Sequence, residues 1–332
     1  MKIYFILTAI LYLIMLISSA IPLIITNTSS ESEDVQAVAQ SAVSATTTAE
    51  TTAKPDNTIS VFSHNDKSVT EVDITDYVCG CLAAEMPLSF HDEALKAQAV
   101  ACYSFALWIK NNADNPKSEL ADVTDSPDTH QAYLNESQLK EKWGNEFPQN
   151  YKKIKKIVSS VSGQYLAFDN EPIMAVYHSL SPGKTQSAEN VWGNDIPYLR
   201  STTAPGDKLS PEYQSSVTLD LNQIKQAVQK NKSYKFNLKA NPIGEIKETD
   251  SGYVESAEIY SVVMNPKELR ALFGLKSPFF SLKKTDNSVT FTVYGYGHGV
   301  GMSQYSADYM ARQGSDYKEI LNHFYKGATL SE

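Results

Sequence analysis

The strongest structural constraint in this sequence is a proline that interrupts a stretch of small and apolar residues. Pro87 pushes the residue before it, Met86, out of the helical region, so a helix that begins near Thr75 should end near Glu85. Thr75 is the expected cap of this helix. The chain therefore turns a corner here, and a single carboxylate, Glu85, is placed at the corner.

A second helix should follow the corner. Ser89 precedes two acids by three and four residues, which is typical of a helix start, and the helix should run to about Lys110. Apolar residues recur along it at steps of three and four and should face the core. This stripe consists of Leu95, Ala99, Cys102, Ala106 and Ile109. All three cysteines (Cys79, Cys81 and Cys102) lie in these two helices, and we expect buried free thiols.

Glu85 ends an apolar segment that has no positive charge nearby. No lysine or arginine occurs in residues 74–95. A carboxyl group in that setting loses hydration without gaining a partner, so its pKa should rise, which is the direction that a general acid needs. The alternative is a partly exposed glutamate at a helix end that has no chemical role.

The amino terminus reads as a membrane anchor. Residues 3–25 are almost wholly apolar and uncharged, long enough to cross a bilayer core of about 30 Å at about 1.5 Å per residue. Lys2 precedes the segment and acids follow it, so the amino end should stay in the cytoplasm. A signal-peptidase site at Ser18 and Ala20 is the alternative, but apolar residues resume after it. We therefore expect an uncleaved, single-pass anchor over residues 1–26, with the bulk of the chain outside the cell membrane.

The segment 27–59 should be a flexible tether, because it is rich in Ser, Thr and Ala and contains no aromatic residue. Residues 60–332 then form the folded, extracytoplasmic region. The net charge of the 332-residue chain is −9, which argues against nucleic acid as a partner.

The folded region mixes strands and helices without regular alternation. This favours an α+β fold of mixed or antiparallel strands with packed helices over a doubly wound parallel sheet. Strand or hairpin patterns occur at 60–75, 163–177, 253–264 and 288–296; helical patterns occur at 140–160, around 224, and at 302–312 and 317–325; a surface loop is expected at 111–127.

A glycine-rich segment at 295–301 follows one strand and opens a helix. It lacks the glycine spacing and the lysine of nucleotide-binding loops. Its alternate glycines would let the backbone approach a bulky ligand and would hold His298, Ser303 and Gln304 at a helix start. The alternative is a tight turn that is needed only for packing.

A second loop carries His178, Ser179, Lys184 and Thr185, which could form another wall of a binding site. A histidine that leaves a strand is also a common structural hydrogen-bonding group. His178 and His298 alone are a weak metal signal.

Tyr198 and Arg200 follow this loop and are candidates for sugar stacking or hydrogen bonding, with core packing as the alternative for Tyr198. A serine hydrolase is disfavoured because no nucleophile-elbow sequence occurs. A cysteine hydrolase is disfavoured because the cysteines occupy core helix positions.

Three separated motifs connect these features: AAEMP at 83–87, EALKAQA at 93–99 and GHGVGMSQ at 297–304. Together they resemble the stage II sporulation protein D family, which comprises peptidoglycan lytic transglycosylases of spore-forming bacteria and their amidase-enhancer relatives. The resemblance covers 60–330, almost the whole region outside the expected anchor.

This chain departs from the family pattern at one place. After Ala101 the family usually continues with alanine, arginine and threonine, whereas this chain has Cys102, Tyr103 and Ser104. Whatever the arginine does in relatives is absent here or is supplied from elsewhere.

The resemblance implies that Glu85 is the single catalytic acid, cleaving the bond between N-acetylmuramic acid and N-acetylglucosamine in glycan strands stripped of stem peptides. It leaves open a non-catalytic, wall-binding module that recruits an amidase. Candidate substrate-binding residues are Gln98, His178, Ser179, Lys184, Thr185, Tyr198, Arg200, Gly297, His298, Gly299, Gly301, Met302, Ser303 and Gln304.

Cofactors and partners are also implied by the resemblance. No cofactor is expected, and no metal, because zinc-binding relatives use histidine and cysteine while this chain has no cysteine after Cys102. The expected partners are peptidoglycan glycan strands, a sporulation amidase and a further membrane protein (stage II sporulation proteins P and M).

Overall fold

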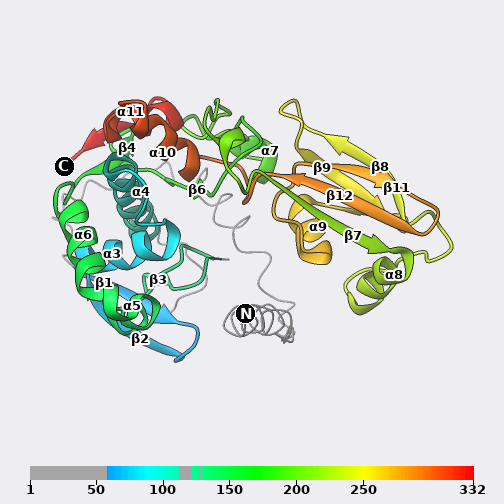
Figure 1. Cartoon of the computed structure of the whole chain (residues 1–332), viewed down its shortest axis with the longest axis horizontal. Helices are drawn as coiled ribbons and strands as arrows, with labels where there is room; N and C mark the ends of the chain where they lie inside the picture. The colour runs from blue at the N-terminus through cyan, green and yellow to red at the C-terminus, as the bar shows by residue number, and fades with distance from the viewer. Residues whose placement is uncertain (1–57, 112–120, 128) are drawn as a thin grey trace, which may run out of the picture. The chain divides into compact units, whose positions relative to one another are not determined.

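The computed structural model describes residues 58–111, 121–127 and 129–332 (Figure 1). The predicted anchor (1–26) and the predicted tether up to residue 57 lie outside the described residues. Within the described ranges, no helix is long and apolar enough to cross a membrane.

Helix α4 (Asp92–Asn111) is the centre of the first hydrophobic core (Figure 1). It is buried around most of its circumference, so it needs neighbours on several sides, and all five stripe residues predicted from the sequence are buried. The elements that contact it include α3 (Ile74–Glu85), α6 (Phe147–Ser159), α10 (Gln304–Arg312), α11 (Tyr317–Phe324) and β4 (Tyr165–Phe168).

The corner after α3 forms where Pro87 predicts it. The helix ends at Glu85, and Met86 is extended with φ −125° and ψ 141°. The predicted cap is wrong by two residues: the Asp73 carboxylate accepts hydrogen bonds from the backbone N–H groups at the helix start, including that of Thr75 at 2.8 Å. Aspartate is the stronger cap because it carries a charge at the positive end of the helix dipole.

The predicted cap of α4 is also wrong. Ser89 lies three residues before the helix begins at Asp92, because the chain first makes a turn in which the Phe90 N–H donates to the carbonyl of Pro87 at 3.0 Å. The ring nitrogen Nδ1 of His91 then accepts from the N–H of Glu93 at 3.3 Å.

The predicted hairpin at 60–75 is confirmed as β1 (Thr58–Ser63) and β2 (Ser68–Asp73), paired antiparallel. A two-residue strand, β3 (Val123–Thr124), pairs parallel with β1 and is buried, so that part of the predicted surface loop is wrong. The predicted tether ends too late along the chain, because Ile59 already lies in β1 and is fully buried.

The predicted helix at 140–160 is broken. It consists of α5 (Glu136–Trp143), a 3-10 turn (Gly144–Glu146) and α6. Gly144 ends α5 with φ +50°, a conformation that favours glycine and stops the helix. The predicted hairpin near 163–177 is shorter than expected: β4 pairs with β5 (Glu171–Pro172) on one side and with β14 (Thr329–Ser331) on the other.

A second hydrophobic core lies between Ile224 and Val293. One sheet has the order β11-β12-β7 and the other has the order β10-β9-β8, all antiparallel. The elements are β7 (Gln214–Asp220), α8 (Leu221–Lys230), β8 (Ile243–Glu248), β9 (Val254–Ile259), β10 (Val262–Met264), α9 (Pro266–Phe273), β11 (Phe280–Lys284) and β12 (Ser288–Tyr294). The predicted single strand at 253–264 is a hairpin, because Tyr260 and Ser261 turn the chain with positive φ.

The remaining elements connect the segments that carry the candidate site. They are β6 (Tyr177–His178), α7 (Ala188–Trp192), a 3-10 turn (Asp207–Leu209) and β13 (Met302–Ser303). β13 pairs parallel with β6, so the predicted helix at 302–312 begins two residues late, at Gln304. The mixed helices and mainly antiparallel sheets confirm the predicted α+β class.

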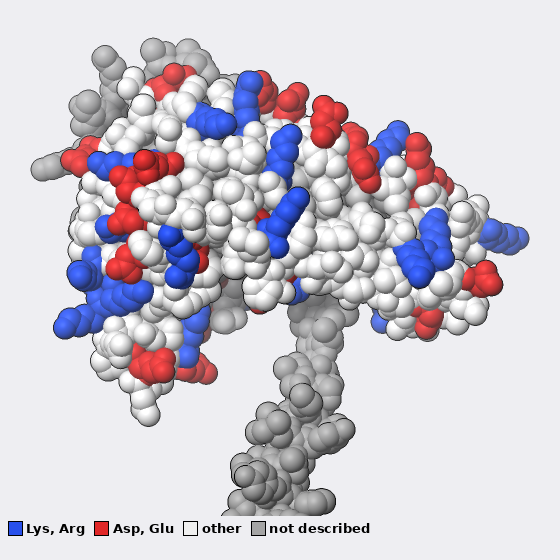
Figure 2. Space-filling model, turned by 45° about the horizontal axis from the view of Figure 1, so that its top comes forward, with Lys and Arg blue, Asp and Glu red and all other residues white. Residues whose placement is uncertain are grey.

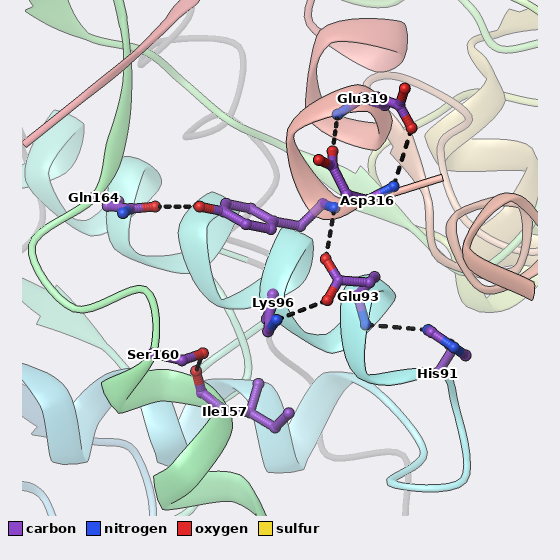
Figure 3. A network of polar contacts seen from close by, with 9 residues as sticks. His91, Glu93, Lys96, Ile157, Ser160, Gln164, Asp316 and Glu319 are labelled. Carbon is purple, nitrogen blue, oxygen red and sulfur yellow. Dashed lines mark hydrogen bonds and ion pairs between the residues drawn. The ribbon is translucent and has the colours of Figure 1, made fainter. Parts of the chain in front are cut away.

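Helix α11 is tied to the start of α4 by one carboxylate (Figure 3). Glu93 accepts from the Lys96 ammonium at 2.6 Å and from the backbone N–H of Tyr317 at 2.9 Å. The Tyr317 hydroxyl donates to Gln164 at 2.9 Å. The bond between Glu93 and Tyr317 holds the start of α11 against α4, although 224 residues separate the two in sequence.

Candidate functional site

Glu85, the last residue of α3, is half-buried and oriented by a segment outside its own helix. Its Oε1 accepts a hydrogen bond from the backbone N–H of Ala132 at 2.8 Å. Burial raises the pKa of Glu85, and the Ala132 bond, the charge of Lys142 and the hydroxyl of Tyr177 oppose that rise. The net rise is the direction expected from the sequence, and it favours the protonated form that a general acid requires.

The approach of the Ala132 segment to α3 depends on a helical glycine. A side-chain carbon at Gly80 would lie 2.5 Å from both the carbonyl oxygen of Leu134 and the ring of Tyr133. With glycine at this position, the ring of Tyr133 lies over α3 and stacks on the ring of Tyr77, with centroids 5.2 Å apart. Gly80 therefore allows the backbone after residue 130 to lie directly against α3, which brings the Ala132 N–H to the carboxyl of Glu85.

A buried polar network lies beside Glu85. The Tyr177 hydroxyl donates to Gln131 Oε1 at 2.9 Å, and Gln131 Nε2 donates to the Tyr77 hydroxyl at 3.1 Å and to the Cys102 carbonyl at 3.2 Å. The Cys102 thiol donates a hydrogen bond to the Tyr177 oxygen, with the sulfur and oxygen atoms 3.6 Å apart. Sequence reasoning missed Tyr177 and Gln131, and the only available signal for Tyr177 was its place beside His178.

The same network reaches two predicted binding residues. Gln98 Nε2 donates to Cys102 Sγ at 3.3 Å, and Gln304 Nε2 donates to Gln98 Oε1 at 3.3 Å. Burial raises the pKa of Cys102 to about 12, so it remains a thiol. The three cysteines are free and buried, as predicted. Gln98 is fully buried and Gln304 is 6% exposed, so in this conformation they connect the network to α10 and present almost no surface to a ligand.

The glycines of the 295–301 segment let the backbone approach protein atoms. A side-chain carbon at Gly301 would lie 1.9 Å from the carbonyl oxygen of Val176, one at Gly297 2.8 Å from His178 Cβ, and one at Gly299 2.8 Å from the Tyr253 hydroxyl. Each of these glycines has positive φ. These contacts favour the packing explanation of the segment and leave ligand contact by the three glycines a prediction.

The two histidines share one residue as their hydrogen-bonding partner. Nδ1 of His178 donates to the carbonyl of Val300 at 3.0 Å, and Nδ1 of His298 accepts from the Val300 N–H at 3.1 Å. Their ring centroids are 5.9 Å apart, and Trp192 lies 5.8 Å from His298. Burial lowers the pKa of both rings, that of His298 to about 3, so both are neutral at pH 7.

The Ser303 hydroxyl is hydrogen-bonded to a buried aspartate, Asp207, which was not predicted from the sequence. Asp207, which is fully buried, accepts from the hydroxyls of Ser303 and Ser306 at 2.6 and 2.7 Å and from the backbone N–H of Ser181 at 2.5 Å. Asp207 therefore connects the His178 loop to the start of α10. No sequence motif marks it, because its partners lie far away along the chain.

The exposed members of the predicted set are few. Lys184 is exposed, and Arg200 is exposed and paired with Asp195 at 2.9 Å. Ser179 and His298 are half-buried.

The other members are packed in the protein. Thr185 is buried with its hydroxyl on the carbonyl of Thr202, and Met302 is fully buried. The Tyr198 hydroxyl accepts from the Met174 N–H at 3.3 Å. Nowhere in the described part of the chain do three or more metal-binding side chains gather to hold an ion.

Residues 63–168, which include Glu85 and α4, match the family model described as stage II sporulation protein. The chain is 36% identical over 277 residues to stage II sporulation protein D of Bacillus amyloliquefaciens, covering 82% of this chain and 78% of that protein. It is 36% identical over 281 residues to the Bacillus subtilis protein of the same name, covering 82% and 79%. The amidase enhancer of Bacillus subtilis is 26% identical over 304 residues, covering 76% of this chain and 40% of that protein.

Proposed function

The chain belongs to the stage II sporulation protein D family, and we propose that it is a peptidoglycan lytic transglycosylase in which Glu85 is the single catalytic carboxyl group. The observation that supports this most is the setting of Glu85. Its pKa is raised by burial, and none of the described groups that shift that pKa is a second carboxylate. Ordinary glycosidases use two carboxyl groups, whereas an intramolecular nucleophile needs only one.

In the proposed reaction Glu85 acts first as an acid and then as a base. Its proton goes to the glycosidic oxygen between N-acetylmuramic acid and N-acetylglucosamine, and the bond to the anomeric carbon breaks. The 6-hydroxyl of the muramic acid attacks that carbon and gives its proton to the ionised Glu85. The product is a 1,6-anhydro end, and Glu85 is protonated again.

The surroundings of Glu85 suit both steps. Burial favours the neutral acid before bond cleavage. The N–H of Ala132, the charge of Lys142 and the hydroxyl of Tyr177 favour the carboxylate that forms in between. Because these groups are held by the fold, they need no rearrangement when the charge develops.

The proposal includes a location and partners. Residues 1–26 would anchor the chain in the cell membrane with the amino end in the cytoplasm, and residues 27–57 would tether the enzyme so that it reaches the wall during sporulation. A partner amidase would remove stem peptides first, in a complex that includes stage II sporulation proteins P and M. On the face shown in Figure 2, lysine and arginine are interspersed with aspartate and glutamate, whereas a nucleic acid would call for clustered basic side chains.

A second candidate is a non-catalytic module that binds glycan and enhances an amidase. The relative named amidase enhancer favours it. So does Tyr103, which stands where the family usually has arginine and packs edge-on against Tyr165, with centroids 6.4 Å apart.

One assay separates the two candidates. The purified full-length chain is incubated with glycan strands stripped of peptides, and the soluble products are analysed by mass spectrometry. Fragments with 1,6-anhydromuramic ends are expected. Strands that remain intact while the protein co-sediments with them would support the module and overturn the enzyme.

A further inference from the structure

Tyr177 lies at the junction between Glu85 and the glycine-rich segment, and backbone pairing sets its position. It is the first residue of β6 and pairs with Met302 of β13. Successive side chains of a strand point to opposite faces, so the Tyr177 hydroxyl reaches Gln131 while His178 contacts Val300. Ala132, the next residue after Gln131, donates its N–H to Glu85, so the Tyr177 hydroxyl and the Glu85 carboxyl group lie against two adjacent residues.

The protons of this cluster can be assigned from the chemistry of its members. The carbonyl of Cys102 only accepts, so the Gln131 atom that bonds to it is the amide nitrogen and Oε1 faces Tyr177. Tyr177 must therefore donate its single proton to Gln131 Oε1 in this arrangement. The thiol of Cys102 donates to the Tyr177 oxygen. A phenolic oxygen accepts hydrogen bonds as well as donating one, so Tyr177 can also accept a hydrogen bond from the O–H of Glu85 when Glu85 is protonated.

The ionised carboxylate of Glu85 demands the opposite arrangement, because it only accepts. Rotation of the Tyr177 O–H group about its C–O bond would turn its hydrogen from Gln131 toward Glu85. A hydrogen bond to a charged oxygen is roughly twice as strong as a neutral one, which favours this arrangement once Glu85 is ionised.

We propose that Tyr177 is a positioning residue whose hydroxyl donates to Gln131 while Glu85 is the acid and to Glu85 while Glu85 is the base. The proposal rests on the proposed function and deepens it. No covalent bond changes, since only the direction of one O–H group alternates. Gln131 is required for this alternation, because its Oε1 is the second acceptor for the Tyr177 hydroxyl.

Other groups near Glu85 do not supply this alternation. Lys142 and the N–H of Ala132 can only donate, so they favour the carboxylate in every step. Cys81 and Cys102 lie close enough for the charge of Glu85 to help raise the pKa of their thiols, but burial is the larger cause, raises the pKa of Cys102 to about 12, and keeps both thiols neutral.

Two variants should shift the protonation of Glu85 in opposite directions. Tyr177→Phe removes the donor to the carboxylate, so the pKa of Glu85 should rise. Gln131→Met removes the acceptor that Tyr177 needs while Glu85 is protonated, so the pKa of Glu85 should fall. Tyr165→Phe, which removes a hydroxyl from β4 outside this network, is the matched control and should leave the titration unchanged.

The titration is followed in the full-length protein by NMR of ¹³C-labelled glutamate carboxyl groups, with Glu85→Gln assigning the signal. The alkaline limb of the pH profile of glycan cleavage should move with it, to higher pH in Tyr177→Phe and to lower pH in Gln131→Met. In the unmodified chain, the side-chain amide signal of Gln131 should titrate with the same midpoint as Glu85. This last measurement needs no variant to fold.

The outcomes separate the two proposals. Opposite shifts of the Glu85 signal in the two variants, with a coupled Gln131 signal, support the alternating hydroxyl even if the chain cleaves no glycan, in which case the proposed function alone fails. A Gln131 signal that does not respond to Glu85, or an unchanged Glu85 titration in folded Tyr177→Phe, overturns the role of Tyr177, whatever the cleavage activity.

Discussion

The backbone N–H of Ala132 donates a hydrogen bond to Glu85 Oε1 over 2.8 Å, although 47 residues separate the two in sequence. A rigid backbone donor fixes the direction of the carboxyl group more firmly than a flexible side chain would. It also stabilises the carboxylate, while burial stabilises the neutral acid. Glu85 is thus held in one orientation with its two protonation states in closer balance than burial alone would allow.

Glu85→Gln should abolish glycan cleavage and keep the fold. The glutamine oxygen can still accept from Ala132, but the side chain cannot transfer a proton, and general acid catalysis typically contributes about 10²–10⁴-fold. The measurement is the rate of release of 1,6-anhydro ends from stripped strands, with circular dichroism and co-sedimentation as controls. Undiminished release by the variant would remove Glu85 from the mechanism.

The raised pKa of Glu85 should also appear in the stability of the chain. Between the usual glutamate pKa of about 4.3 and the raised value, the folded chain holds a proton that the unfolded chain has lost. The free energy of unfolding therefore falls as pH rises through this window. The Glu85→Gln variant has no carboxyl group at this position and does not lose this stability. The difference between its free energy of unfolding and that of the parent chain, measured by urea denaturation, should therefore increase with pH. Parallel pH curves for the two proteins would contradict the burial of this carboxyl group.

Asp207→Asn should destabilise the junction between the His178 loop and α10. The carboxylate accepts from Ser181, Ser303 and Ser306, and an amide NH₂ in place of one oxygen would face a donor. Leaving buried donors without an acceptor should cost about 2–4 kcal/mol in the free energy of unfolding. Ser306→Ala serves as the comparison and should cost about 1 kcal/mol. Equal losses in urea denaturation would show that the charge of Asp207 is not what holds this junction.

Gly301→Ala and Gly193→Ala form a matched pair. Both glycines have similar positive φ, +72° and +78°, so both variants carry a strain of about 1–2 kcal/mol. Only at Gly301 would the new carbon meet the Val176 carbonyl, at 1.9 Å, whereas nothing lies within 4 Å at Gly193. Gly301→Ala should therefore unfold at clearly lower urea concentration than Gly193→Ala. Similar midpoints would mean that β6 and β13 can move apart without loss.

The local part of this architecture was predictable from sequence, because its causes are local. Pro87 sets the end of α3, and the spacing of apolar residues predicts the buried stripe of α4. The predicted cap of α3 was wrong because Asp73 competes with Thr75 for one position and is favoured by its charge. The predicted cap of α4 was wrong because a turn after Pro87 delays the start of the helix to Asp92.

The distant part of the site was not predictable in the same way. Tyr177, Gln131 and Asp207 have no motif, and their partners lie far along the chain. A two-residue parallel strand such as β13 has no periodicity to detect. The glycine-rich motif was visible, but whether its glycines face ligand or protein depends on which strand lies beside it.

The pairing of β6 with β13 has a consequence for the order in which the molecule is completed. Glu85 is among the first folded residues to leave the ribosome, yet the strand that positions Tyr177 is paired only after residue 303 has been synthesised. A nascent or truncated chain that ends before that residue contains the acid without its finished surroundings. With the proposed activity on the cell wall, late assembly of this kind would keep unfinished molecules harmless.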